Sequence, residues 1–370
     1  MLSAFGISYL DHHIPIIKGV NMACRIALDA MGGDHAPREV VLGAIKAAET
    51  LSDLEIVLVG DQKQIETELH KANSTFPFEI IHTDEWVGMG EDPKEAIRSK
   101  ENASINIASQ LLKDNQVTAL VSAGNTGATI LSAAKYIPVI EGIERTALAT
   151  VYPTAKFEKN RRGFGLMLDV GATLHCTAKQ LVHFAFMGNF YLSEALDIEH
   201  PRIGLLNIGE EETKGGDVLK KTYQLLKKAD ELNFIGNIEG KDIPQGVADV
   251  VVTEGFIGNV VLKMLEGLAE VVKETGKYAF KKKLRWKLGL MLLAPGIRKL
   301  RRRTDYTEYG GAPILGFKKL AIKAHGRSNA KAISNAIRVA ADSSRRNICE
   351  KIEESIATFN LKHALELSEI

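Results

Sequence analysis

Short apolar runs alternate along the chain with segments in which apolar residues recur every three or four positions. The runs predict buried β-strands, and the spacing of three or four predicts helices. The first unit is the apolar run 26–31, a glycine-rich polar turn, and a helix that begins near Pro37 and places Val40, Val41 and Ala44 on one face. Strands that alternate with helices of ten or more residues indicate an α/β protein with a mainly parallel sheet.

The same order of strand, glycine turn and helix returns four times. The later units contain the segments LVSAGNTG (120–127), MLDVG (167–171), LLNIGE (205–210) and VVTEGFIGN (251–259). The carboxyl ends of parallel strands meet at one edge of a sheet, where ligands bind in open α/β folds. A glycine turn at a helix N-terminus offers an anion free N–H groups and the positive end of the helix dipole. We therefore predict an anion-binding site at this edge.

Composition is typical of a soluble globular chain, with 370 residues of which 45% are hydrophobic and 25% charged. We expect one catalytic domain over 25–347, an N-terminal extension (1–24) and a C-terminal tail (348–370). Polar residues and a proline interrupt the extension, which lacks the pattern of a secretory signal, so we expect a disordered arm or a start codon assigned too early. The three cysteines are far apart and predict neither disulfides nor a metal site.

One segment carries most of the positive charge. Residues 277–303 contain eleven Lys or Arg and no Asp or Glu, and removing them from the overall +1 leaves about −10 for the rest of the chain. Within a predicted arm over 260–305, apolar residues share a helical face and Pro295-Gly296 predicts a reversal. The apolar part is shorter than the roughly 20 residues that span a bilayer.

A basic amphipathic hairpin of this kind is suited to an anionic membrane surface or to an acidic protein. The alternative is a dimerisation arm whose leucines form the interface. The predicted membrane-contact residues are Leu288, Leu290, Met291, Leu292 and Leu293.

Several common catalytic motifs are absent from the sequence. There is no G-x-x-x-x-G-K-[ST] loop for a nucleoside triphosphate and no G-x-G-x-x-G after a strand for a nicotinamide cofactor. The G-x-S-x-G elbow and the H-E-x-x-H helix are also missing, which argues against a serine acyl-enzyme and a zinc hydrolase. Turns that bind anions remain, without a nucleophile of their own, so a substrate is the expected nucleophile. We expect no cofactor, no metal and no nucleic-acid partner.

The candidate site residues lie in or beside the glycine turns. Catalytic roles are predicted for His35, Asn125, Lys323 and His325. Substrate binding is predicted for Asp29, Gly32, Gly33, Asp34, Arg98, Gly124, Thr126, Gly127, Asn207, Gly209, Lys214 and Asn259.

Some of these residues have a structural alternative. Asn125 or Thr126 could cap the following helix, and Arg98 could lie on a solvated helix face. His325 could be a structural histidine, although Lys323 and a glycine turn stand beside it.

Six segments in order resemble the bacterial phosphate acyltransferases of phospholipid synthesis, the PlsX family. They are ALDAMGGDHAP (27–37), LVSAGNTGA (120–128), LLNIGEEETKG (205–215), GFIGNVVLK (255–263), YGGAPILG (309–316) and IKAHGRSNA (322–330). The resemblance covers roughly 25–347. Three positions depart from the expected pattern: Thr173 and Gly216 stand where asparagine is expected, and Glu254 where aspartate is expected. We assign no site role to Thr173 or Gly216.

The resemblance implies transfer of a long acyl chain from acyl carrier protein to inorganic phosphate, giving acyl-phosphate for a downstream glycerol-3-phosphate acyltransferase. It also implies a three-layer α/β fold akin to phosphotransacetylases and isocitrate dehydrogenases, a homodimer, and a cytoplasmic enzyme peripherally attached to the cell membrane through the arm. Two rival hypotheses are a phosphotransacetylase-like enzyme that uses acyl-coenzyme A and a non-catalytic membrane scaffold. Fold likeness alone would not separate them.

Overall fold

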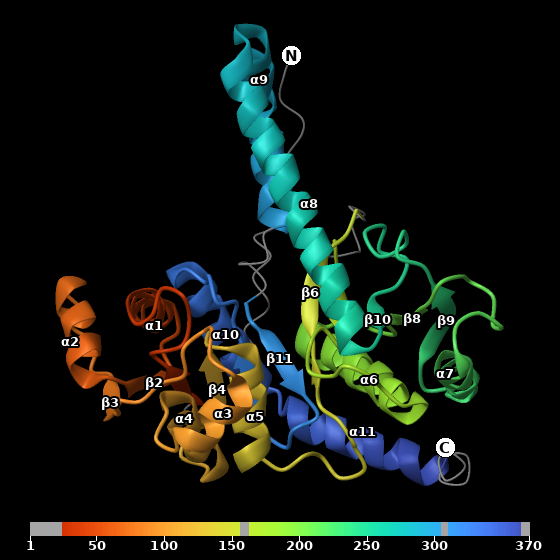
Figure 1. The fold of residues 1–370 in the computed structure, drawn as a ribbon, viewed down its shortest axis with the longest axis horizontal. Helices are drawn as coiled ribbons and strands as arrows, with labels where there is room; N and C mark the ends of the chain where they lie inside the picture. The colour runs from red at the N-terminus through yellow and green to blue at the C-terminus, as the bar shows by residue number, and fades with distance from the viewer. Residues whose placement is uncertain (1–23, 156–162, 305–309, 364–370) are drawn as a thin grey trace, which may run out of the picture.

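The strands fall into two sheets that lie in two lobes, with a long helical arm between them (Figure 1). This architecture comes from a computed structural model that describes residues 24–155, 163–304 and 310–363. The first sheet has seven strands in the order β3-β2-β1-β4-β12-β11-β5. Their bounds are β1 Cys24–Asp29, β2 Leu54–Gly60, β3 Glu79–His82, β4 Ala119–Ser122, β5 Ala147–Leu148, β11 Ala312–Leu315 and β12 Leu320–Lys323.

The core strands of this first sheet are parallel, because β1 pairs with β2 and β4, and β4 pairs with β12, all in parallel register. Helices cover both faces. One face packs against α1 (Arg38–Thr50) and α10 (Ala330–Arg345), and the other against α3 (Pro93–Ser99), α4 (Ser104–Lys113) and α5 (Thr126–Tyr136). Helix α2 (Gln62–Lys71) lies beside β3.

The second sheet has five strands in the order β6-β7-β10-β8-β9. Their bounds are β6 Thr150–Pro153, β7 Phe164–Leu168, β8 Arg202–Leu206, β9 Asn233–Ile238 and β10 Val250–Val252. Helices α6 (Ala178–Phe190), α7 (Asp217–Lys228) and α11 (Ile348–Lys362) share a core with one face of this sheet, and residues 191–195 continue α6 as a π-helical turn. The predicted α/β class is confirmed, although the chain builds two sheets where the sequence pattern suggested one.

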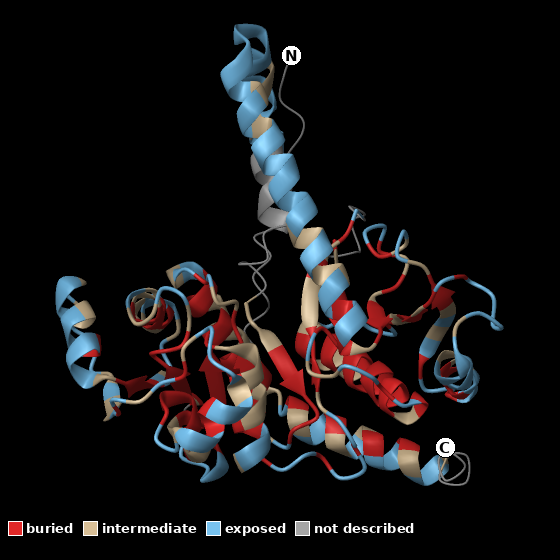
Figure 2. Ribbon diagram, in the orientation of Figure 1, coloured by how far each residue is buried: buried red, intermediate tan, exposed pale blue. Residues whose placement is uncertain are grey.

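Buried residues are concentrated in the sheets and in the helix faces that touch them, while the arm is almost wholly exposed (Figure 2). A shared core, which includes Val57 and Leu120 of the first sheet and Met167 and Val251 of the second, joins the two sheets. The predicted extension 1–24 lies outside the described residues except for Cys24. The segment expected to be a tail contains α11, whose Ile352, Ile356 and Phe359 are buried, so this helix is part of the core.

The arm consists of α8 (Gly255–Lys282) and α9 (Leu284–Thr304), which pack against each other (Figure 1). The reversal predicted at Pro295-Gly296 is wrong. The chain turns back at Lys283, which has extended backbone angles, and α9 continues through Pro295. Proline removes one backbone N–H, and in an exposed helix water can satisfy the carbonyl that loses its partner. Three consecutive lysines, 281–283, stand at the break.

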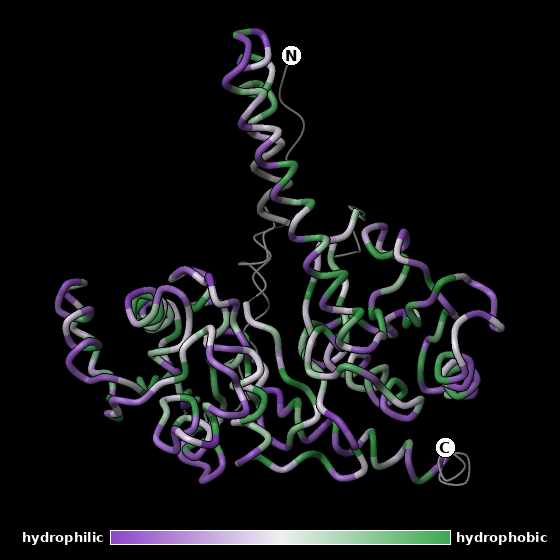
Figure 3. Tube along the Cα trace, viewed as in Figure 1, coloured by the Kyte–Doolittle hydropathy of each residue, from purple (hydrophilic) through white to green (hydrophobic). Residues whose placement is uncertain are grey.

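Hydrophobic and hydrophilic residues alternate along the arm (Figure 3). Within the described residues, no helix is both long and apolar enough to cross a bilayer.

Candidate active site

Three side chains form a row across neighbouring strands at the carboxyl edge of the seven-stranded sheet. Asp29 is the last residue of β1, Ser122 the last of β4 and Lys323 the last of β12, and Ser122 is the register partner of both others. Successive side chains of a strand point to opposite faces. Since Ala27, Leu120 and Ala321, two positions earlier, all join the core on the α3–α5 face, the row faces that side as well. All three side chains are buried.

Asp29 is held by hydroxyl groups on both of its oxygens. Ser104, the first residue of α4, donates to Oδ1 at 2.6 Å, and Ser122 donates to Oδ2 at 2.7 Å. Burial raises the pKa of Asp29, while these two hydrogen bonds and the Lys323 charge oppose the rise. A buried carboxylate with two hydroxyl donors and a neighbouring ammonium is therefore a fixed counter-ion in this site.

Lys323 places an ammonium group at the same edge. Its Nζ donates a hydrogen bond to the carbonyl of Ala324. Burial lowers the pKa of Lys323 to about 8, and the negative charges of Asp29 and Asp34 limit the decrease. An ammonium of this kind is charged at neutral pH and poorly hydrated, so it favours a bound anion.

The glycine turns after β1, β4 and β12 approach one another closely. A Cβ atom on Gly32 would lie 2.4 Å from Asp29 Oδ2 and 2.7 Å from the backbone nitrogen of Gly124, so only glycine fits there. Gly33 has a φ of +118°, which also favours glycine. The backbone N–H of Asp34 donates to the carbonyl of Gly326 at 2.8 Å, which joins the first turn to the last.

Asn125 caps α5, as the structural alternative predicted. Its Oδ1 accepts from the backbone N–H of Ala128 at 3.1 Å, and its Nδ2 donates to the carbonyls of Met89 at 3.1 Å and Glu91 at 3.2 Å. Its amide thus ties the loop before α3 to the turn after β4. Thr126 is the first residue of α5, and Gly127 lies where a Cβ would meet Pro93 at 2.8 Å, which indicates a packing role for that glycine.

His325 follows β12 and lies against α8. Its Nδ1 accepts a hydrogen bond from the backbone N–H of Arg327 at 3.1 Å, so a neutral ring carries its proton on Nε2. Nε2 lies 3.9 Å from Glu266 Oε1, and Glu266 Oε2 accepts from Lys263 Nζ at 2.9 Å. Burial lowers the pKa of His325; Glu266 opposes this, while the nearby cations Lys263, Lys323 and Arg327 add to it. The ring is therefore mostly neutral at pH 7.

Other predicted residues lie further out or on the second sheet. His35, Asp34 and Arg98 are exposed. The candidates Asn207, Gly209 and Lys214 follow β8 of the five-stranded sheet, where the buried Asn207 side chain donates to the carbonyl of Lys214 at 3.2 Å. Asn259 is exposed on the first turns of α8. The structure thus joins the candidates that follow β1, β4 and β12 into one cluster, and the β8 group belongs to the other sheet.

Sequence reasoning missed the residues that hold this cluster in place. Ser104, Lys263 and Glu266 lie on helices and carry no turn signal, and Ser122 precedes the glycine turn of the segment 120–127. Asp169, in the MLDVG segment, accepts hydrogen bonds from four backbone N–H groups and from Thr173 Oγ1, at 2.7 to 3.1 Å. Thr173 Oγ1 in turn accepts from the N–H of Gly255, the first residue of α8, at 3.0 Å. An aspartate directly after an apolar run was the signal available in the sequence.

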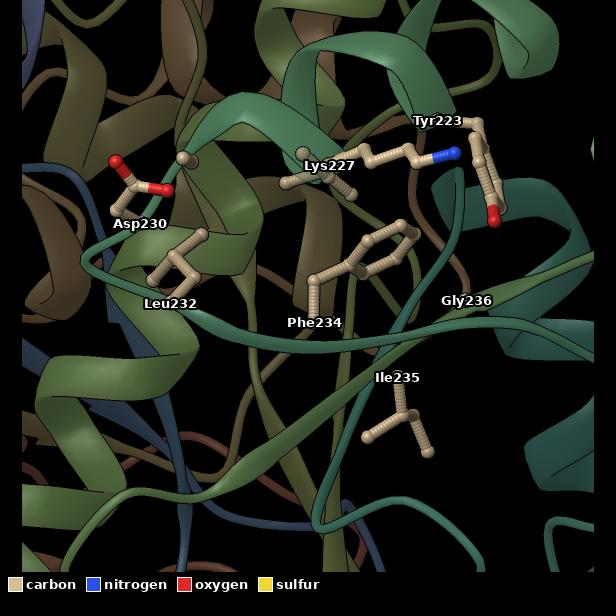
Figure 4. A pocket seen from close by; sticks show the side chains of 9 residues that line it. Tyr223, Lys227, Asp230, Leu232, Phe234, Ile235 and Gly236 are labelled. Carbon is tan, nitrogen blue, oxygen red and sulfur yellow. The ribbon is translucent and has the colours of Figure 1, made fainter.

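Two other features contain no catalytic candidate. The carboxylates of Glu210, Glu239 and Asp242 lie within 4.8 Å of one another, the one group in the described chain with a spacing that suits a metal. Lys241 Nζ already contacts Glu239 and lies 3.6 Å from Glu210. A hollow of about 410 Å³ lies between α7 and β9, with Tyr223, Lys227, Leu232, Phe234 and Ile235 in its lining (Figure 4).

Comparison with known proteins gives consistent matches. Residues 24–351 match the family described as fatty acid synthesis protein. A phosphate acyltransferase of Thermoanaerobacter pseudethanolicus is 43% identical over 332 residues, which cover 90% of this chain and 97% of the relative. A phosphate acyltransferase of Heliobacterium modesticaldum is 46% identical over 334 residues, again 90% of this chain and 97% of the relative.

Solved structures with a similar fold are more distant in sequence. A phosphotransacetylase of Streptococcus pyogenes gives a TM-score of 0.58 at 16% identity, covering 87% of this chain and 94% of that one. A branched-chain phosphotransacylase of Enterococcus faecalis gives 0.52 at 15%, covering 88% and 99%. At these identities the likeness concerns the fold, and it confirms the expected three-layer α/β architecture.

Proposed function

The chain belongs to the fatty acid synthesis protein family as a phosphate acyltransferase, and from that premise we propose that it moves a long-chain fatty acyl group from acyl carrier protein to inorganic phosphate. Hydrogen phosphate attacks the thioester carbonyl and forms the carbon–oxygen bond of a tetrahedral intermediate, and the collapse of this intermediate breaks the carbon–sulfur bond and gives the acyl-phosphate. The proton of the attacking phosphate ends on the released thiol. Phosphate is itself the nucleophile, so the protein has to position it and stabilise the tetrahedral oxyanion.

The observation that carries this proposal is the buried ammonium of Lys323 among three glycine turns. Phosphate would lie on the backbone N–H groups of the turns after β1 and β4, with Lys323 balancing its charge. Asp29, held by Ser104 and Ser122, keeps the ammonium at the sheet edge.

We assign to His325 the stabilisation of the negative charge that develops on the thioester carbonyl oxygen. Its neutral ring holds a proton on Nε2, because Nδ1 is occupied by the N–H of Arg327. A neutral imidazole stabilises an oxyanion by donating a hydrogen bond from its N–H, and the proton stays on the ring. Asn125 supports the site by holding the loop before α3 against the turn after β4.

The arm supports the proposals for partners and location. Its basic residues contrast with an otherwise acidic chain, and positive charge attracts an acidic carrier protein and an anionic membrane. Near the Lys283 turn, Leu288, Met291, Leu292 and Leu293 are exposed by 53 to 84%, which suits peripheral insertion into the inner face of the cell membrane. Leu290 is partly buried. The acyl-phosphate would then be released close to the glycerol-3-phosphate acyltransferase that consumes it.

A second apolar surface supports a homodimer. It runs along α8 at intervals of four residues, which form a ridge that winds gradually around the helix: Phe256, Val260, Met264, Leu268 and Val272, all exposed by at least 51%. An exposed apolar stripe of this length is typical of an interface between subunits.

The test is release of free carrier protein from long-chain acyl carrier protein, with and without phosphate, by the purified protein without membranes. We expect phosphate-dependent release and an acyl-phosphate product. Release only from acyl-coenzyme A would identify the rival transferase. Inactivity on both, without stabilisation by either ligand, would favour a scaffold.

A further inference from the structure

Helix α8 contributes side chains to the cluster at the edge of the seven-stranded sheet, although the sequence assigned it to the arm. Its N-terminus follows β10 of the other sheet, where Thr173 accepts from the N–H of Gly255. Two to three turns later, Lys263 and Glu266 lie near His325, and Lys263 also lies near Lys323. The base of the arm is thus in contact with residues that we assign to catalysis.

Nδ1 of His325 accepts a backbone hydrogen bond, and Nε2 faces a carboxylate. The N–H of Arg327 holds Nδ1 at 3.1 Å, and the carboxylate of Glu266 lies 3.9 Å from Nε2 on the opposite side of the ring. Glu266 is itself anchored by Lys263 at 2.9 Å on the same helix. Both His325 and Glu266 have about 35% of their side chains exposed, so a substrate can reach the gap between them.

We propose that Glu266 is a positioning residue for His325: its negative charge on the Nε2 side holds the ring in the orientation seen here, with the Nε2–H at the place where the carbonyl oxygen of the acyl donor enters. This inference rests on the proposed function. The 3.9 Å separation is longer than a hydrogen bond, so a carbonyl oxygen that enters beside the carboxylate can accept the Nε2 proton without rotation of the ring. Acyl transfer at the edge of the seven-stranded sheet therefore depends on a residue of the arm.

The charges that face His325 come from three elements. Glu266 and Lys263 approach from α8, Lys323 from β12, and Arg327 from the turn before α10. Glu266 is the only one among them, within the described chain, that favours the protonated ring. Glu266→Gln therefore lowers the pKa of His325, and the acidic limb of the rate profile moves to lower pH.

The experiment compares Glu266→Gln with Glu270→Gln, a matched substitution one turn further along α8 at an exposed position. We expect Glu266→Gln to lower kcat roughly ten- to hundredfold with little change in the KM for phosphate, the loss that follows a small displacement of a catalytic group. The acidic limb of the pH–rate profile of Glu266→Gln moves to lower pH. Glu270→Gln has the rate and pH profile of the wild type. Glu266→Asp recovers part of the rate that Glu266→Gln loses. The ionisation of phosphate is the same for every variant, so it does not contribute to the differences between their pH profiles.

Titration of the His325 ring followed by NMR, assigned with His325→Gln, is an independent measurement. A lower ring pKa in Glu266→Gln supports the proposal. Equal rates and pH profiles for the two glutamine variants would overturn it, and so would a slow Glu266→Gln whose His325 titration is unchanged. If the wild type itself shows no phosphate-dependent release, the proposed function fails, whereas the ring titration still reports whether Glu266 and His325 interact.

Discussion

Replacement of Lys323 tests the proposed site most directly. Lys323→Met removes the ammonium and keeps an unbranched side chain of similar length. A hydrogen bond to a charged group contributes about 1.5–3 kcal/mol. At 1.36 kcal/mol for each factor of ten, kcat/KM for phosphate should fall by roughly 10- to 150-fold. The fold should survive, because the hydroxyls of Ser104 and Ser122 still satisfy Asp29.

The pH dependence gives the sharper form of this prediction. With the pKa of Lys323 at about 8, the ammonium is mostly charged at neutral pH and loses its proton above that value. Phosphate-dependent kcat/KM should therefore fall about tenfold for each pH unit above 8, since this parameter reports the free enzyme. Lys323→Arg keeps its charge over the whole range, so its profile should lack this limb even if the bulkier group lowers the rate.

The assay is the initial rate of thiol release at subsaturating phosphate between pH 6 and 10, with circular dichroism to verify folding. A limb near pH 8 that persists in Lys323→Arg would assign the titration to another group. A loss of less than about twofold in Lys323→Met would exclude the ammonium from phosphate binding, because the range above starts near tenfold.

Three further outcomes follow from the structure. Asn125→Ala removes a helix cap and should lower the free energy of unfolding by about 1–2 kcal/mol in a denaturant titration, with lower phosphate-dependent turnover in a folded protein; full turnover would remove Asn125 from the site. Gly32→Ala brings a Cβ to within 2.4 Å of Asp29 Oδ2 and should lower kcat/KM on the order of a hundredfold, whereas Gly90→Ala, with open space around it, should match the wild type. Leu288→Glu with Leu292→Glu should abolish sedimentation with anionic vesicles and leave transfer intact; loss of activity together with monomer formation would favour the dimer-arm alternative.

The sequence predicted the local units of the fold well, for physical reasons. Strands β1, β4 and β12 end in glycine turns whose pattern is visible in the chain, and their carboxyl ends meet because parallel strands share a direction. The pattern therefore located Asp29 and Lys323 correctly at one sheet edge. It did not reveal that Asp29 is enclosed by Ser104 and Ser122, because those contacts span 75 and 93 residues of chain.

Other features depend on pairings that periodicity does not encode. The division into two sheets is decided by which strands find partners, and β8 thereby carries Asn207 away from the turns of the first sheet. Glu266 has helical spacing like any residue of α8, and its role appears only once that helix lies against His325. The C-terminal helix α11 was missed because its apolar residues match a core formed some 150 residues earlier in the chain.

Helix α8 also couples movement at the tip of the arm to the position of Glu266. Its first residue is fixed to the Asp169 and Thr173 turn, and its 28 residues extend about 42 Å at 1.5 Å each. Glu266 lies eleven residues from the fixed end, about 0.4 of the way to Lys282. If the helix tilts as a rigid rod, a movement of about 3 Å at its far end displaces Glu266 by about 1.2 Å, enough to alter a catalytic contact. A membrane or a protein that binds the tip of the arm and tilts the helix would therefore change the position of Glu266 relative to His325.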